Sequence, residues 1–341
     1  MTVLPRRADF QHQPLVGFFR PEADQGAVTE QYFGLVLEGT WFYGIMRTES
    51  GQSYAMLRKA VGYTTRDIAI MASDEVGLRA DPRSRQASIG GKVERRLEDG
   101  YDVTAGGSRA RGAHFEVRLG DEDFTWSETG TEGPILELSG RLAAPGFQVY
   151  VPWRTAADEA GRTGEPGALY YTSTAYLAEG TMFGEKVTGF FAVDQSYLPH
   201  GVDWNNSAIW NRLQGGWNVF ANEYDDGTVE WGHMSIGADR FRFAAVASQD
   251  GPVVDSRSVE ASIEWRDEEF VDRIVFDVGD GRPWEFVTDA NGEMVEFSAA
   301  RPGWSGHAGV LRRVDEQRRI VRHWAWQEVF PSRVQGAGGR A

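Results

Sequence analysis

Asp-Gly and Asn-Gly pairs recur along this chain, and the residues between them alternate between apolar and polar side chains. Such pairs adopt the positive φ angles that tight β-hairpins need, and they lie at residues 99–100, 226–227, 250–251, 280–281 and 291–292. Phe115 and Val117 share one face of a predicted strand, and Trp324 and Trp326 share one face of another. Helical periodicity is scarce, and Val310–Arg322 is the segment for which helix and strand both stay open. We therefore predict an almost all-β chain of antiparallel hairpins, arranged in barrels or sandwiches.

The composition argues against several classes of function. The 341 residues are enough for two domains of ordinary size. A net charge of −15, from 35 basic and 50 acidic residues, repels nucleic-acid backbones and anionic lipid. Because the chain has no cysteine, disulfides, thiolate nucleophiles and cysteine metal sites are excluded. The first residues lack a signal-peptide pattern and no apolar stretch reaches ~20 residues, so we expect a cytoplasmic protein without membrane insertion.

The common cofactor and metal motifs are absent. The sequence has no phosphate-binding G-x-x-x-x-G-K-[ST] loop, no G-x-G-x-x-G between strand and helix, and no G-x-S-x-G nucleophile turn. Its six histidines form no H-x-H, H-x-x-x-H or H-E-x-x-H pair. We therefore expect no cofactor and no metal, and look for chemistry carried by carboxyl, phenol and imidazole groups.

One acid follows a predicted strand that is apolar on both faces. Residues 186–193 form that strand, and Asp194 comes directly after it. A buried carboxylate must be paired, hydrogen-bonded or raised in pKa, because burying it bare costs several kcal/mol. Such acids gather at functional sites, although structural ion pairs produce the same pattern. Asp194 is therefore either an acid–base catalyst or a structural group.

Aromatic residues and histidines supply the remaining candidates. The chain holds 12 Trp, 11 Tyr and 19 Phe, which fits either ordinary β-packing or a ring-lined cavity for an apolar ligand. His200 and His233 lie within or beside aromatic-rich strands, where a single histidine is more often structural. Tyr170 and Tyr171 precede the hairpin at Gly180, and most tyrosines in such a position simply pack.

The middle of the chain resembles the central signature of the hydroxyneurosporene synthase (carotenoid 1,2-hydratase) superfamily. In that family a tyrosine doublet precedes a Gly-Thr hairpin, and the next strand ends in an Asp-His-x-Trp motif. Here Asp194 matches the aspartate, Gln195 stands in place of the histidine, and Tyr197 in place of the tryptophan. Trp217, ahead of an Asp-Gly hairpin, resembles the tryptophan strand that follows the motif. The remaining matching positions are Tyr170, Tyr171, Gly180, Thr181, Gly184, Val187 and Gly189.

The resemblance implies two lipocalin-like β-barrels in tandem. It also implies relatives that hydrate isoprenoid or phenolic double bonds, or steer cycloadditions, without a cofactor. Since the amide of Gln195 cannot titrate, proton transfer would fall to Asp194, alone or with Tyr171 or His233. We predict a cofactor-independent lyase, of hydratase or elimination type, that acts on a hydrophobic aromatic or isoprenoid small molecule. A non-catalytic carrier of an apolar metabolite, and a pericyclase or isomerase on the same fold, are the alternatives.

These arguments give a set of site residues and a division of the chain. The predicted catalytic residues are Asp194, Tyr171 and His233. The predicted substrate-binding residues are Gln195, Tyr197, His200, Tyr170, Trp217, Phe190 and Trp231. We expect an irregular arm at 1–25, an exposed loop at 155–167 and a disordered tail at 335–341, with lipocalin-like β-domains at 26–189 and 190–334. A homodimer is left open beside a monomer.

Overall fold

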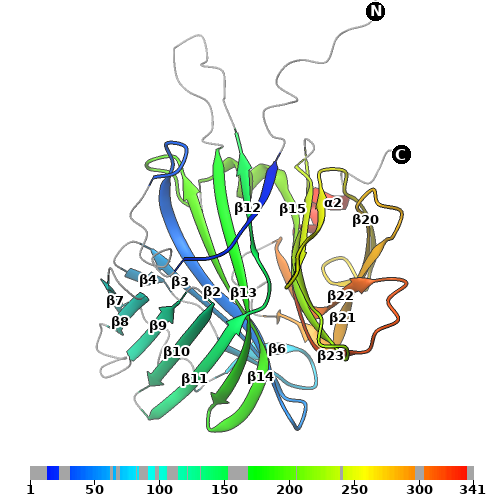
Figure 1. The fold of residues 1–341 in the computed structure, drawn as a ribbon. Helices are drawn as coiled ribbons and strands as arrows, with labels where there is room; N and C mark the ends of the chain where they lie inside the picture. The colour runs from blue at the N-terminus through cyan, green and yellow to red at the C-terminus, as the bar shows by residue number, and fades with distance from the viewer. Residues whose placement is uncertain are drawn as a thin grey trace, which may run out of the picture.

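Two curled antiparallel sheets make up the described part of the chain (Figure 1). The computed structural model describes residues 14–22, 31–61, 64–66, 70–81, 83, 91–96, 100–105, 114–120, 122–130, 132–152, 168–204, 206–238, 241–295 and 303–335. The loop expected at 155–167 lies outside these residues. The all-β prediction is confirmed, and so is the arrangement of two β-domains in tandem.

The first sheet curls back on itself. Its strands follow the order β1-β12-β13-β11-β10-β9-β8-β7-β4-β3-β2-β14, and an additional pairing of β13 with β14 joins the last strand of this path to the third. β5 and β6 extend the sheet beside β3. The strands are β1 Leu15–Phe19, β2 Val36–Thr48, β3 Ser53–Val61, β4 Thr64–Arg66, β5 Ile70–Ser73, β6 Leu78–Ala80, β7 Gly91–Arg96, β8 Gly100–Ala105, β9 His114–Leu119, β10 Asp123–Gly130, β11 Gly133–Leu142, β12 Gly146–Val151, β13 Leu169–Met182 and β14 Glu185–Leu198.

The second sheet has the order β18-β17-β16-β15-β23-β22-β21-β20-β19. Its strands are β15 Gln214–Tyr224, β16 Val229–Gly237, β17 Phe243–Ser248, β18 Gly251–Ser256, β19 Glu260–Trp265, β20 Val271–Asp277, β21 Trp284–Glu293, β22 Ser305–Arg313 and β23 Ile320–Val329. A short π-helical turn, η4 (Ile209–Leu213), precedes the sheet, and α2 (Pro331–Gln335) follows it. The open segment 310–322 is thus the end of β22, a turn and the start of β23 rather than a helix.

The two longest strands form the hairpin that carries the predicted acid. Phe183 and Gly184 have φ angles of 51° and 84°, the two positive values that a type I′ turn requires. This turn sets the register, in which Ser173 of β13 pairs with Asp194 of β14. β14 continues beyond the apolar run at 186–193, because the polar side chains at its end find hydrogen-bond partners on β13 and β2.

Alternation gives β14 two buried faces, each belonging to a different core. Phe191 packs in a cluster made by the first sheet alone, whereas Ala192 packs in a cluster shared by both sheets. We call the shared one the inter-sheet cluster; its largest members are Tyr43, Phe147, Tyr171, Phe190, Trp210, Trp217, Trp231, Phe243, Trp324 and Trp326. Asp194 lies two residues beyond Ala192 and points the same way, while Gln195 points to the opposite face.

Two details differ from the expected division of the chain. Leu15–Phe19 form β1, which pairs with β12, so part of the arm expected at 1–25 belongs to the first sheet. β14 lies wholly in the first sheet and β15 opens the second, so the change of sheet falls between residues 198 and 214, after the boundary predicted near residue 190. A strand that is apolar on both faces can cross between domains or close one barrel, and here it closes the first sheet.

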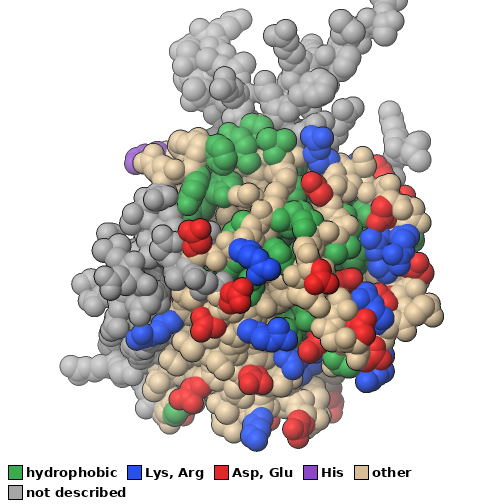
Figure 2. All heavy atoms as spheres, in the orientation of Figure 1, with side chains coloured by type: hydrophobic (Ala, Val, Ile, Leu, Met, Phe, Trp, Pro, Cys, Tyr) green, Lys and Arg blue, Asp and Glu red, His purple; other side chains and the backbone are tan. Residues whose placement is uncertain are grey.

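The surface carries both signs of charge. Acidic and basic side chains are interspersed over the face drawn in Figure 2, with apolar side chains gathered toward its upper part. Several arginines there and elsewhere form exposed ion pairs, such as Arg282 with Asp315 at 3.1 Å. No helix among the described residues combines the length and the apolar character that a membrane span requires.

Candidate functional site

Asp194 lies in the middle of the wall that the first sheet presents to the second. Its neighbours in register on the same face are Ser173 on β13 and Trp41 on β2. Only 5% of the residue is exposed to solvent. The carboxyl group is therefore removed from bulk water and enclosed by the inter-sheet cluster.

Each oxygen of this carboxyl group accepts a hydrogen bond from a hydroxyl group. The Tyr171 hydroxyl donates to Oδ2, and the Ser173 hydroxyl donates to Oδ1. Burial raises the pKa of Asp194 from 3.8 to about 7, and the two hydroxyl donors offset part of that effect. At neutral pH the group consequently exchanges between its acid and its base form, which is the condition that general acid–base catalysis favours.

Two phenols next to Asp194 stay protonated. Burial, and then the negative charge of Asp194, raise the pKa of both Tyr171 and Tyr43 well above 10. The Tyr43 hydroxyl is close enough to influence Asp194 and Tyr171, although its geometry does not complete a hydrogen bond to either. The acid therefore has phenolic O–H groups beside it over the whole physiological pH range.

The second sheet supplies the opposite wall. Trp217 packs edge-on against Tyr171, with 5.0 Å between ring centroids, and against His233, with 4.0 Å. His233 also stacks on Phe243 at 5.0 Å. The imidazole is fully buried, and burial lowers its pKa well below 6.5, so it is neutral at physiological pH. Neither of its nitrogens has a hydrogen-bond partner among the described residues.

The inter-sheet cluster brings together most of the predicted site residues. Asp194, Tyr171 and His233 face it, and the imidazole of His233 contacts the ring of Tyr171, with centroids 6.4 Å apart. Among the predicted substrate-binding residues, those in the cluster are Trp217, Phe190 and Trp231. The Trp231 indole donates to the carbonyl oxygen of Pro145 at 2.8 Å, a hydrogen bond that links the two sheets.

The other predicted binding residues lie elsewhere. Tyr170 and Tyr197 pack with Leu35 in a small cluster of their own. Gln195 accepts a long hydrogen bond of 3.4 Å from the Tyr197 hydroxyl. His200 is exposed in the turn after β14. Alternation along β14 places Gln195 and Tyr197 on the face opposite to Asp194, although both lie within three residues of it.

A shallow pocket opens beside Gln195 on the side of the sheet away from Asp194. Its empty volume is about 330 Å³ including the open mouth. The lining residues are Phe19, Pro21, Glu22, Leu119, Gly120, Thr172, Thr174, Tyr176, Val193 and Gln195. This pocket has no access to the carboxyl group of Asp194, so it is a separate feature from the inter-sheet site.

Two residues beside Asp194, Ser173 and Tyr43, were not predicted from the sequence. Ser173 lies two positions after Tyr171, and the alternation of a strand could have placed it on the same face. Tyr43 comes from β2, far away in the sequence, and no local pattern marks it. The tryptophans Trp210 and Trp324, which complete the cluster, were likewise not singled out as site residues.

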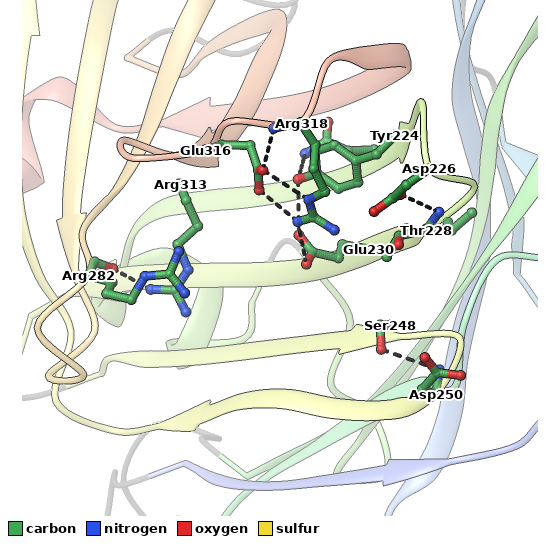
Figure 3. A network of polar contacts seen from close by, with 12 residues as sticks. Tyr224, Asp226, Thr228, Glu230, Ser248, Asp250, Arg282, Arg313, Glu316 and Arg318 are labelled. Atoms are coloured by element: carbon green, nitrogen blue, oxygen red, sulfur yellow. Dashed lines mark hydrogen bonds and ion pairs between the residues drawn. The ribbon is translucent and has the colours of Figure 1, made fainter.

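Another group of charges, partly buried, lies at the turn between β22 and β23. The Arg318 guanidinium stands between Glu316, at 2.6 Å, and Glu230, at 3.1 Å, and stacks on Tyr224 at 3.8 Å (Figure 3). The hydrogen bond from Arg318 lowers the pKa of Glu316 to about 2. A carboxylate held ionised by arginine stabilises a turn, in contrast to the protonatable Asp194. In the part of the chain that the structure describes, no three His, Cys, Asp or Glu residues are grouped as a metal site would need.

Comparison with solved structures identifies the fold. A protein described as AttH from Nitrosomonas europaea superposes with a TM-score of 0.50 and 15% identity, over 88% of this chain and 94% of that chain. The chain shares the all-β fold of that protein. Kievitone hydratase from Nectria haematococca gives a TM-score of 0.45 at 12% identity, over 92% of this chain and 98% of that chain. CghA, solved with Sch210972, gives a TM-score of 0.39 at 10% identity over the same shares of the two chains. No protein-family model and no curated protein matches the sequence significantly.

Proposed function

We propose that this protein is a cofactor-independent lyase, of hydratase or elimination type, that binds a hydrophobic small molecule between its two sheets. Asp194 is its general acid and base. The observation that carries the proposal is the carboxyl group itself, which is 5% exposed, has a pKa near 7 and accepts a hydroxyl hydrogen bond at each oxygen. If Asp194 served only to stabilise the fold, we would expect an arginine or lysine beside it to compensate its charge, because a buried charge without a partner is destabilising.

The chemistry follows from the two forms of this group. In its acid form, Asp194 gives its proton to one carbon of a double bond, and the π electrons form the new C–H bond. The positive charge that develops on the other carbon is stabilised by the faces of neighbouring aromatic rings. Water then attacks that carbon and returns a proton to the carboxylate, so that one water is added and the acid is restored. Elimination of water runs through the same steps in reverse.

Tyr171 and His233 have supporting roles in this scheme. The Tyr171 hydroxyl holds Oδ2 and so fixes the direction in which Asp194 presents its proton. The neutral imidazole of His233 offers one N–H donor and one acceptor nitrogen, which suits it to orient the attacking water. Trp217, Phe190 and Trp231 form the apolar walls against which the substrate would pack.

A carrier of apolar metabolites is the second candidate, and a separate observation favours it. The pocket beside Gln195 opens on the face of β13 and β14 opposite to Asp194, and most of its lining is apolar or uncharged. A ligand held there would contact Gln195 and would not meet Asp194, which is absent from the lining. A pericyclase would use the inter-sheet site for shape alone and would not need the acid.

Binding and turnover of a compound panel separate these functions. Quenching of tryptophan fluorescence by phenolic, terpenoid and polyene compounds identifies ligands, and mass spectrometry of the recovered compound shows whether it has changed. We expect a product that differs by one water, and Asp194→Asn should lower turnover by ~10²–10⁴-fold while leaving binding intact. Asp289→Asn, which changes an ion-paired aspartate outside the site, should keep full turnover. Recovery of an unchanged ligand would support the carrier, and full turnover by Asp194→Asn would contradict the catalytic role.

A further inference from the structure

The inter-sheet cluster buries indole N–H groups that have no acceptor. The Nε1 atoms of Trp210 and Trp324 lack a hydrogen-bond partner among the described residues, and both side chains are at most 2% exposed. His233 lacks a partner at both nitrogens and is fully buried. Because buried donors in folded proteins are nearly always paired, such groups indicate a missing partner.

Other tryptophans of the same cluster are satisfied by the chain. The indole of Trp231 donates to the Pro145 carbonyl at 2.8 Å, and that of Trp326 donates to Glu328 at 2.9 Å. Unpaired indoles are therefore not a general property of this packing. Among the buried tryptophans of the inter-sheet cluster they are those of Trp210 and Trp324, and Trp284, in the core of the second sheet, is a further buried indole without an acceptor among the described residues.

These donors lie on both sides of the candidate acid. Trp210 packs edge-on against Trp217, with 5.1 Å between ring centroids, and Trp217 contacts Tyr171. Trp324 packs against Tyr43 at 5.4 Å. Since Tyr171 and Tyr43 both adjoin Asp194, aromatic contacts connect each of the two indoles to the surroundings of the acid.

The balance of donors and acceptors restricts what such a ligand can be. Two indoles supply only donors, and a neutral imidazole adds one donor and one acceptor. A hydrocarbon would leave every one of these donors desolvated and unpaired, and an anionic ligand would meet the carboxylate form of Asp194. A neutral carbonyl oxygen accepts two hydrogen bonds and brings no donor of its own. It can therefore pair with the donors that exceed the acceptors in this cluster.

We propose that the substrate of the inter-sheet site is an apolar molecule with carbonyl oxygens, which accept hydrogen bonds from the indole N–H groups of Trp210 and Trp324. The inference rests on the proposed function only in placing the substrate at Asp194. It makes the two tryptophans residues that determine specificity, by selecting ketone-bearing molecules over polyene hydrocarbons of the same shape.

Two naphthalene derivatives that differ only in a carbonyl oxygen and the methylene group that replaces it test this inference. 2-Acetylnaphthalene carries a carbonyl, and 2-isopropenylnaphthalene has nearly the same shape with a methylene group in its place. Isothermal titration calorimetry on the wild-type protein should show the ketone binding about tenfold more tightly. Trp324→Phe and Trp210→Phe should each weaken ketone binding and leave binding of the alkene unchanged.

Trp326→Phe is the matched control. It removes an indole on the same strand and face as Trp324 that contacts Tyr43 at a similar distance, 5.5 Å, but whose N–H already has an acceptor in the chain. This variant should keep the full preference for the ketone. Equal binding of the two naphthalenes by the wild-type protein, binding of neither, or an equal loss of preference in Trp326→Phe would overturn the inference.

The outcome is independent of catalysis. Binding is measured without turnover, so a ketone preference that depends on the two indoles would survive even if Asp194→Asn were fully active. Conversely, turnover that requires Asp194 but shows no ketone preference would refute the carbonyl inference and leave the lyase proposal intact. Folding of each variant is checked by its near-ultraviolet circular dichroism.

Discussion

Replacement of Asp194 by asparagine should change how the stability of this protein depends on pH. The pKa of Asp194 is about 7 in the folded protein because the group is buried, against an ordinary value of 3.8. Between these two values the unfolded chain has released the proton that the folded protein still holds. The unfolded state then binds fewer protons, so the free energy of unfolding falls as the pH rises.

The size of the effect follows from the same two values. Each pH unit in this window removes about 1.4 kcal/mol, which amounts to about 4 kcal/mol over the full interval. Above about pH 7 both states are ionised and the loss is complete. An asparagine side chain cannot ionise, so the Asp194→Asn variant should gain stability relative to the wild type as the pH rises from about 4 to about 7.

Urea unfolding followed by tryptophan fluorescence measures this difference. Free energies of unfolding of the wild type and of Asp194→Asn are compared at intervals from about pH 5 to about pH 8, so that contributions from all other groups cancel. Asp81→Asn is the matched control, because hydrogen bonds from Arg83 lower the pKa of that carboxyl despite its burial. The stabilisation that ionised Asp81 provides is fully present above pH 3.8, so the difference between this variant and the wild type should be constant over this range.

The reasoning fails if the difference between Asp194→Asn and the wild type is also constant from about pH 5 to about pH 8. That result would mean that Asp194 is ionised in the folded protein, like an ordinary surface carboxylate. It would remove the acid form on which the proposed chemistry depends.

Two further substitutions test the surroundings of this acid and the core of the first sheet. Tyr171→Phe removes a hydroxyl that lowers the pKa of Asp194, so that pKa should rise above 7, as read from the pH at which the infrared band of the protonated carboxyl disappears. Glu128→Leu leaves the buried Arg58 without the carboxylate that pairs with it at 2.7 Å, which should cost about 3–5 kcal/mol in urea unfolding. Adding Arg58→Met to that variant should restore most of the loss, and its failure to do so would contradict the ion-pair explanation.

Local patterns predicted most of the strands of the second sheet, although Asn291-Gly292, predicted as a turn, lies inside β21 where its register shifts. Alternation and Asp-Gly turns act over a few residues, and the turns at 226–227, 250–251 and 280–281 each connect two neighbouring strands of the second sheet. The prediction that Trp324 and Trp326 share a face is confirmed, because both belong to the inter-sheet cluster while Ala325 packs on the other side of the sheet.

The partners of Asp194 were only partly accessible from the sequence. A two-residue turn at Phe183 and Gly184 fixes the register of the hairpin, so the pairing of Ser173 with Asp194 could have been derived from it. Tyr43 depends on the pairing of β14 with β2, which joins segments far apart in the chain and has no local signal.

Gln195 follows Asp194 directly in the sequence, but the two side chains lie on opposite faces of β14. Neighbouring residues in a strand point to opposite faces, but a strand that is apolar on both sides gives no indication which face belongs to which core. The second sheet decides this, because it packs against the face of Asp194 and brings Trp217 and His233 there. That packing is a long-range event, which the pattern of a single strand cannot reveal.

The position of a bound ligand tests the central claim most directly. A crystal structure of the complex with the tightest ligand of the compound panel should show that ligand between the two sheets, in hydrogen-bond contact with Asp194 or Tyr171. A ligand bound instead in the pocket beside Gln195, or enclosed by the first sheet alone, would contradict the assignment of the inter-sheet cluster as the functional site.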